Sequence, residues 1–130
     1  MTEQEMITRT KKFALRIMKL VGALPKTVQG HAISNQLMRS GTSVAANYRA
    51  ACRARSKREF IAKLGTVEEE ADESAFWLEL IIEGRLLPGK LVIPLLQESS
   101  ELVAIAAAPK KTAASRFFQS QIANRQSAIR

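Results

Sequence analysis

Residues 33–53 read ISNQLMRSGTSVAANYRAACR, and the spacing of their apolar and small side chains decides the fold. One stripe repeats every four and three residues, as one helix face does, and it comprises Ile33, Leu37, Ser40, Val44, Asn47 and Ala51. A second stripe adjoins it and comprises Met38, Gly41, Ala45, Tyr48 and Cys52. These patterns predict a helix from Gln29 to Arg53. Because two stripes are wider than one core face requires, we expect this helix to be covered by its own bundle and by another subunit.

Helices are also predicted on both sides of this segment. A T-x-x-E capping box at Thr2 starts a helix that ends near Val21. An S-x-x-E box at Ser56 starts another, which ends near Leu86. The turn between the second and third helices is very short, so these two helices must be antiparallel neighbours.

A fourth helix is expected over Val92–Ala108, because Pro94 suits only a first turn and Pro109 ends a helix. Residues 1–108 are therefore predicted to form an all-α domain, an antiparallel up-down four-helix bundle. Residues 109–130 contain basic side chains, no acid and no sustained apolar period. We predict that they form a basic, poorly ordered C-terminal tail.

Composition indicates a soluble globular protein, with 46% hydrophobic and 25% charged residues. The single cysteine, Cys52, cannot form an internal disulfide, which favours a reducing compartment. The N-terminus does not have the pattern of a signal peptide. No uninterrupted apolar run approaches the roughly 20 residues of a membrane span. We therefore expect a cytoplasmic protein that does not contact a membrane.

Charge is segregated along the chain, which carries a formal net charge of +8. Residues 39–63 hold seven bases and one acid, whereas residues 68–83 hold seven acids and no base. Five of the bases surround the predicted turn between the second and third helices: Arg49, Arg53, Arg55, Lys57 and Arg58. Lys57 and Arg58 occupy a first helical turn, where the helix dipole disfavours cations. Such placement suggests another use, and two interpretations stay open: an anion-binding role for this end, or a merely solvated turn.

A second group of residues fits contacts between helices or between subunits. It comprises Arg39, Ser40, Gly41, Ser43, Asn47, Glu69 and Glu73. Small residues let two helices approach closely, and a buried Asn must find hydrogen-bond partners. Acids of the third helix can pair with bases of the second. We interpret this group as a structural device that sets register and partner choice, and not as a catalytic centre.

Motifs that carry chemistry are missing from the sequence. A di-iron bundle needs Glu-x-x-His pairs, and His31 is the single histidine. The arginines around Cys52 can lower its thiol pKa, but no base accompanies it, so we interpret it as a packed thiol. No phosphate-binding glycine loop is present. We therefore predict a protein that is not an enzyme, with no cofactor, no metal and no small-molecule substrate.

Several stretches closely resemble one bacterial family. They are RSGTSVAAN at 39–47, ACRARSKREF at 51–60, EEADES at 69–74 and WLE at 77–79. The family consists of proteins encoded in intervening sequences of 23S ribosomal RNA genes, and the resemblance covers about Phe13 to Ala106. It implies a four-helix bundle that assembles into a ring-shaped homopentamer. A related accessory protein of diversity-generating retroelements is a basic pentamer that binds nucleic acid and a reverse transcriptase.

Together, the charge pattern and the resemblance predict a homo-oligomeric module that binds the backbone of RNA or DNA through its basic surface. The alternative is a scaffold whose basic end docks an acidic partner protein.

Overall fold

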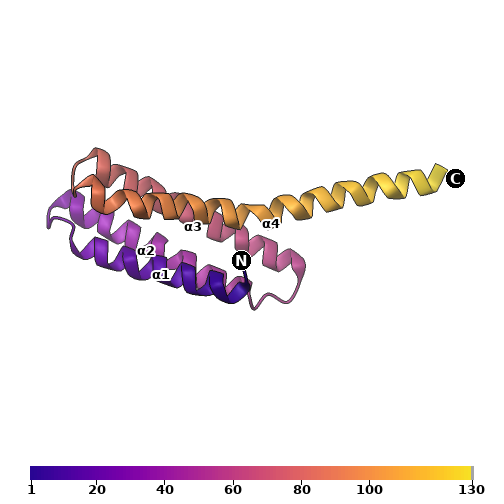
Figure 1. Ribbon diagram of the computed structural model, residues 1–130, viewed down its shortest axis with the longest axis horizontal. Coiled ribbons are helices and arrows are strands. Elements are labelled where there is room, and N and C mark those ends of the chain that lie inside the picture. Colours follow the sequence, from indigo (N-terminus) through magenta and orange to yellow (C-terminus); the bar gives the residue numbers. More distant parts are fainter. Residues whose placement is uncertain (130) are drawn as a thin grey trace.

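The computed structural model describes the backbone of residues 1–129 and the side chains of residues 1–109. Residues 1–129 form four α-helices and no strand: α1 Glu3–Gly22, α2 Val28–Ala51, α3 Lys57–Glu83 and α4 Gly89–Ile129. Successive helices lie side by side and alternate in direction (Figure 1). The predicted all-α fold with four helices is therefore confirmed for this part of the chain.

The four helices occupy successive corners of the bundle. α2 packs against both α1 and α3, and α4 packs mainly against α3. α4 touches α1 over a much smaller surface, so the seam between α1 and α4 is the most open one. Within the described chain, the backbones of α1 and α3 do not approach each other closely, so these two helices lie at diagonal corners. Each of these two helices therefore turns an outer face away from the other.

Side-chain caps start α1 and α3 where the sequence predicts them. The Glu5 amide donates to Thr2 Oγ1, and the Thr2 amide donates to a Glu5 carboxylate oxygen, both at 3.1 Å. This is the predicted capping box. At α3, the Glu59 amide donates to Ser56 Oγ at 3.1 Å. The Glu59 carboxylate, however, accepts from the amide of Arg55 and not from that of Ser56. The second capping box therefore differs from the usual one, because its Glu carboxylate accepts from the residue before the N-cap.

Apolar side chains from all four helices meet in one core. In α1 the buried side chains include Met6, Phe13, Ile17 and Leu20, and in α3 they include Leu64, Val67, Leu78 and Ile81. The largest fully buried apolar side chains are Phe13, Ile17, Leu37, Val44, Val67, Leu78, Ile81, Val92 and Leu102. The four-three stripe predicted for α2 includes Leu37, Ser40, Val44 and Ala51, which are all buried, so this spacing identified the buried face of that helix.

The second stripe of α2 meets α1 of the same chain at Gly41. Gly41 lies so close to Ile17 that a Cβ atom on it would sit 2.8 Å from Ile17 Cγ2. Tyr48, also on this stripe, is buried. The first stripe meanwhile packs towards α3, since Ser40 contacts Ser74. Contacts within one chain therefore account for the buried part of the second stripe, while Met38, Ala45 and Cys52 stay partly exposed, and cover by another subunit stays a prediction.

The predicted bounds of the fourth helix, Val92–Ala108, are wrong at both ends. α4 starts at Gly89, which puts Pro94 in its second turn, and it continues through Pro109 to Ile129. Each proline removes one backbone hydrogen bond. The leucine and alanine residues around them have high helix propensity, so the helix continues on both sides. Apart from Pro109, the predicted tail lies outside the residues whose side chains are described, and its disorder stays a prediction.

The Gly89–Pro109 part of α4 is long and apolar enough to cross a membrane, with a mean hydropathy of 1.5. A search for uninterrupted apolar runs misses it because Glu98 and other polar residues interrupt the stretch. In the bundle, Val92 and Leu102 are fully buried, and the Glu98 carboxylate pairs with Arg9 of α1. We therefore interpret this segment as a core helix of the bundle.

Candidate functional site

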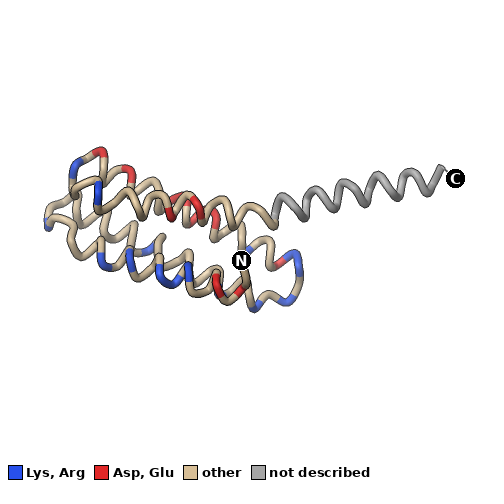
Figure 2. The backbone as a smooth tube through the Cα atoms, viewed as in Figure 1, with Lys and Arg blue, Asp and Glu red and all other residues tan. Residues whose placement is uncertain are grey.

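The basic residues predicted to act together lie at the end of the bundle where α2 joins α3. Arg49 and Arg53 are on the last turn of α2 and just beyond it, Arg55 is in the connecting turn, and Lys57 and Arg58 begin α3. All five side chains are exposed. Figure 2 shows Lys and Arg gathered at this turn.

Three of these cations line one open groove between α2 and α3. Arg49, Arg53 and Arg55 surround a volume of about 490 Å³ together with Lys63 and Glu59, over a floor of alanines. Lys57 and Arg58 are not among the lining residues. The sequence placed Lys63 outside the cluster, although it lies one helical turn after Glu59 on α3 and so shares its face.

Arg49 and Arg53 also border a second groove, between α1 and α2. Its volume is about 600 Å³, and its lining includes Lys11 and Glu3 from α1 and Cys52 from the end of α2. The two arginines therefore form a ridge between two adjoining grooves. Lys11 is far from this ridge in sequence and was missed, because only the packing of α1 against α2 brings it there.

The cations of these grooves carry no ion pair with any side chain of residues 1–109. Across the described side chains, carboxylates pair with Arg9 and Arg39, at 2.7 Å for Arg9–Glu98 and 3.2 Å for Arg39–Glu70. The hydrogen bonds that Arg9 and Arg39 donate to these carboxylates raise the pKa of both guanidinium groups. The arginines at the basic end have no comparable partner among the described side chains. Uncompensated cations around a groove attract anions.

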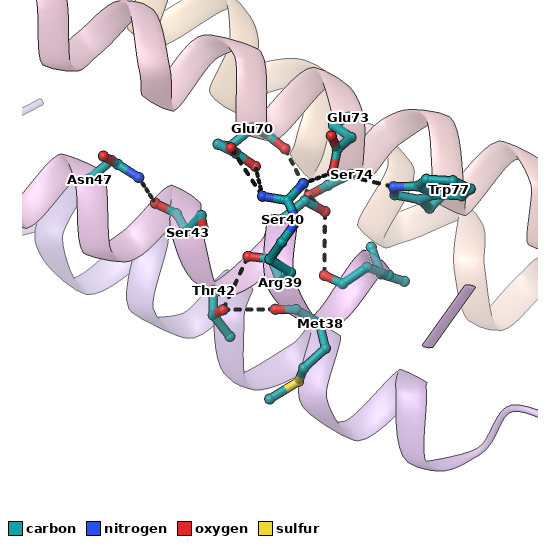
Figure 3. A network of polar contacts seen from close by, with 11 residues as sticks. Met38, Arg39, Ser40, Thr42, Ser43, Asn47, Glu70, Glu73, Ser74 and Trp77 are labelled. Carbon is teal, nitrogen blue, oxygen red and sulfur yellow. Dashed lines mark hydrogen bonds and ion pairs between the residues drawn. The ribbon is translucent and has the colours of Figure 1, made fainter. Parts of the chain in front are cut away.

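Arg39 instead joins α2 to α3 (Figure 3). Its guanidinium donates to both Glu70 carboxylate oxygens at 3.2 and 3.3 Å, and also to Glu73. Trp77 Nε1 donates to the same Glu73 carboxylate at 3.4 Å. Sequence reasoning selected Arg39 and Glu73 but missed Glu70. The sequence could have indicated Glu70 as well, because residues 70, 73 and 77 have the spacing of one helix face.

The remaining residues of the assembly group divide between helix contacts and the surface. Ser40 Oγ lies 2.9 Å from Ser74 Oγ, and both side chains are fully buried between α2 and α3. Asn47 Nδ2 donates to the Ser43 carbonyl at 2.9 Å, within its own helix. Asn47 is thus satisfied without a neighbouring helix. Glu69 is exposed on α3.

The described side chains do not assemble a reactive centre. Burial raises the pKa of the Cys52 thiol and raises the pKa of Tyr48 to about 12, so neither group is activated at neutral pH. His31 is exposed near the start of α2. Among residues 1–109, no group of three or more His, Cys, Asp or Glu side chains can hold a metal.

Fold and site together define a small helical bundle with one uncompensated basic end. The family model of 23S rRNA-intervening sequence proteins matches residues 2–108, and the chain belongs to this family. This confirms the resemblance carried by residues 39–47 and extends it over the whole bundle. The chain is also similar to the crystal structure of a protein of unknown function, from the S23 ribosomal protein family, of Bacteroides thetaiotaomicron VPI-5482. The two are 32% identical with a TM-score of 0.74, over 79% of this chain and 95% of that one. No curated protein matches the sequence.

Proposed function

We propose that this protein is a non-enzymatic, homo-oligomeric module that binds the sugar–phosphate backbone of RNA or DNA through its basic end. One observation carries the proposal. Four cations, Arg49, Arg53, Arg55 and Lys63, line a single groove, and none has an ion-pair partner among residues 1–109. The acid of this groove, Glu59, accepts a backbone amide at the start of α3.

The chemistry of the groove suits phosphate better than bases. Arginine offers several donors in a planar fork that matches phosphate oxygens. Stacking on bases needs exposed aromatic rings, but Tyr48 is buried and Phe60 is half-buried. Contacts to phosphate alone position nucleic acid without reading its sequence. We therefore expect binding that depends weakly on sequence and strongly on salt.

Repetition of the basic end in an oligomer supplies the affinity that one copy lacks. A single groove with a few phosphate contacts binds weakly, whereas linked copies make later contacts intramolecular. Identical basic ends on one assembly would engage several phosphates along a strand.

Salt-dependent binding tests this function. Fluorescence anisotropy with labelled single-stranded and duplex RNA and DNA is measured over a series of salt concentrations. The logarithm of the binding constant falls against the logarithm of salt by roughly 0.7–0.9 for each phosphate contact. Arg53→Glu/Arg55→Glu should therefore weaken binding and make this slope shallower, by the amount that corresponds to at least one to two lost phosphate contacts.

The matched control reverses two lysines at the opposite end of the bundle, Lys26→Glu/Lys90→Glu. Each double variant loses four charge units, from +8 to +4, because every reversal removes two. The control should retain most of the affinity and the slope. Equal losses in both variants, or no binding of wild type at low salt, would overturn the proposal. A protein partner retained from lysate after nuclease treatment, with no nucleic-acid binding, would favour the scaffold alternative.

A further inference from the structure

Two outer faces of the bundle combine exposed apolar side chains with charge of one sign. On α1, Leu15 is 57% exposed and Met18 is 46% exposed, and the two lie three residues apart on the helix. The exposed lysines Lys11, Lys12 and Lys19 lie within one turn of Leu15. This surface, the α1 face, is thus an apolar centre with a basic rim.

The corresponding surface on α3 has the opposite charge. Phe76 is 50% exposed, and its ring meets Trp77 edge-to-face with centroids 5.0 Å apart. Trp77 is itself packed against the core and donates to Glu73, so Phe76 stands on a fixed support. Exposed acids share its helix face at the four-three spacing: Glu69, Asp72, Glu79 and Glu83. This surface, the α3 face, is an apolar centre with an acidic rim.

The two faces complement each other but cannot meet within one chain. α1 and α3 occupy diagonal corners of the bundle, and the exposed faces that carry Leu15 and Phe76 lie on their outer sides. Figure 2 shows Lys and Arg along α1 and Asp and Glu along α3. Interfaces place apolar anchors at the centre and charged groups at the rim, where opposite charges set partner and register. A second copy of this chain carries the required counterpart of either face.

We propose that the α1 face of one copy docks on the α3 face of the next. Leu15 and Met18 pack against Phe76, while the lysines around them meet the acids around it. The two patches differ, so the contact is heterologous and every copy offers one of each. Repetition then closes a ring or extends a filament. The inference rests on the homo-oligomer proposed above, and it leaves the groove at the α2–α3 turn accessible.

Charge exchange between the faces tests this interface. Lys12→Glu/Lys19→Glu makes both faces acidic, and Asp72→Lys/Glu79→Lys makes both basic. Light scattering should show that wild type is a multiple of the 14.4 kDa chain mass and that each double variant falls to one chain. An equimolar mixture of the two variants should associate again. A single chain carrying all four substitutions should also recover the wild-type mass.

Circular dichroism confirms that every variant is folded, and recovery in the mixture excludes misfolding as the cause of dissociation. Lys26→Glu/Lys90→Glu, away from both faces, should keep the wild-type mass. A wild type of one chain mass overturns both the homo-oligomer and this interface, while the salt-dependent nucleic-acid assay still decides the basic end. An oligomer that survives both double variants, or that the mixture fails to restore, overturns this interface alone. The interface is also overturned if Lys12→Glu/Lys19→Glu lowers the affinity for nucleic acid but leaves the mass of the oligomer unchanged.

Discussion

Replacement of Gly41 by alanine measures how closely α1 and α2 are packed. The added Cβ would lie 2.8 Å from Cγ2, 2.9 Å from Cγ1 and 3.1 Å from Cβ of Ile17. Carbon atoms prefer separations of about 3.5–4.0 Å. Ile17 is fully buried, and its branched side chain contacts Gly41 through atoms next to the backbone, so it cannot swing aside. Overpacking of this kind costs about 1–3 kcal/mol.

Alanine also has an intrinsic advantage over glycine inside a helix, of about 1 kcal/mol. The net effect of Gly41→Ala should therefore be a loss of about 0–2 kcal/mol in the free energy of unfolding. Gly65→Ala is the matched control, because Gly65 is also inside a helix but a Cβ there meets no atom within 4 Å. This control should gain about 0.5–1 kcal/mol. The two variants should thus differ by about 1–3 kcal/mol.

Urea unfolding followed by circular dichroism provides the comparison. It is performed at one protein concentration, since self-association contributes to measured stability. Ile17→Ala removes both Cγ atoms and should cost about 2–5 kcal/mol alone. Combined with Gly41→Ala it should cost less than the sum, because the new methyl fills part of the cavity. If Gly41→Ala stabilises the protein as much as Gly65→Ala does, the close contact between α1 and α2 is refuted.

Two further predictions concern the polar contacts between helices. The hydrogen bond from Arg9 lowers the pKa of Glu98 in the folded protein. The ionised carboxylate therefore stabilises the fold at every pH above its unfolded pKa of about 4.3. This stabilisation is lost as the pH falls through the lower folded pKa. Glu98→Gln should reduce the free energy of unfolding at neutral pH by about 1–2 kcal/mol. Urea titrations should show that the free energies of unfolding of variant and wild type differ less in acid. A difference that does not change with pH would contradict the prediction. Ser74→Ala leaves buried Ser40 with a 3.4 Å contact to its own helix and should cost about 1–2 kcal/mol. A double-mutant cycle with Ser40→Ala should show that the pair costs less than the sum of the single changes, and strict additivity would refute a coupled Ser40–Ser74 hydrogen bond.

Local rules account for most of what the sequence alone determined. The caps at Thr2 and Ser56 start α1 and α3, because a hydroxyl followed three residues later by Glu satisfies amides that have no helical partner. The four-three stripe through Leu37 and Val44 marks the buried face of α2, because side chains at this spacing share one side of a helix. These effects act within one or two turns and need no knowledge of the fold.

The fourth helix shows where local rules fail. Proline costs about 3 kcal/mol inside a helix, which predicted that Pro94 and Pro109 would mark its limits. In the structure, α4 runs through both residues. At its start, burial of Val92 and Leu95 holds the segment in the bundle. Burying one such side chain is worth about 1.5–3 kcal/mol, so packing can outweigh the local penalty at Pro94.

The basic end was visible in the sequence because its five cations lie within ten residues around one turn. The sequence did not show which of these cations lack an ion-pair partner. Tertiary structure neutralises Arg39 through Glu70 and Glu73, leaves Arg53 unpaired among the described side chains, and adds Lys63 to its groove. The sequence by itself determined helices, caps and the clustering of charge, since these follow from neighbours along the chain. Only the packing of helices decided which charges meet, because distances between helices depend on how their faces fit together.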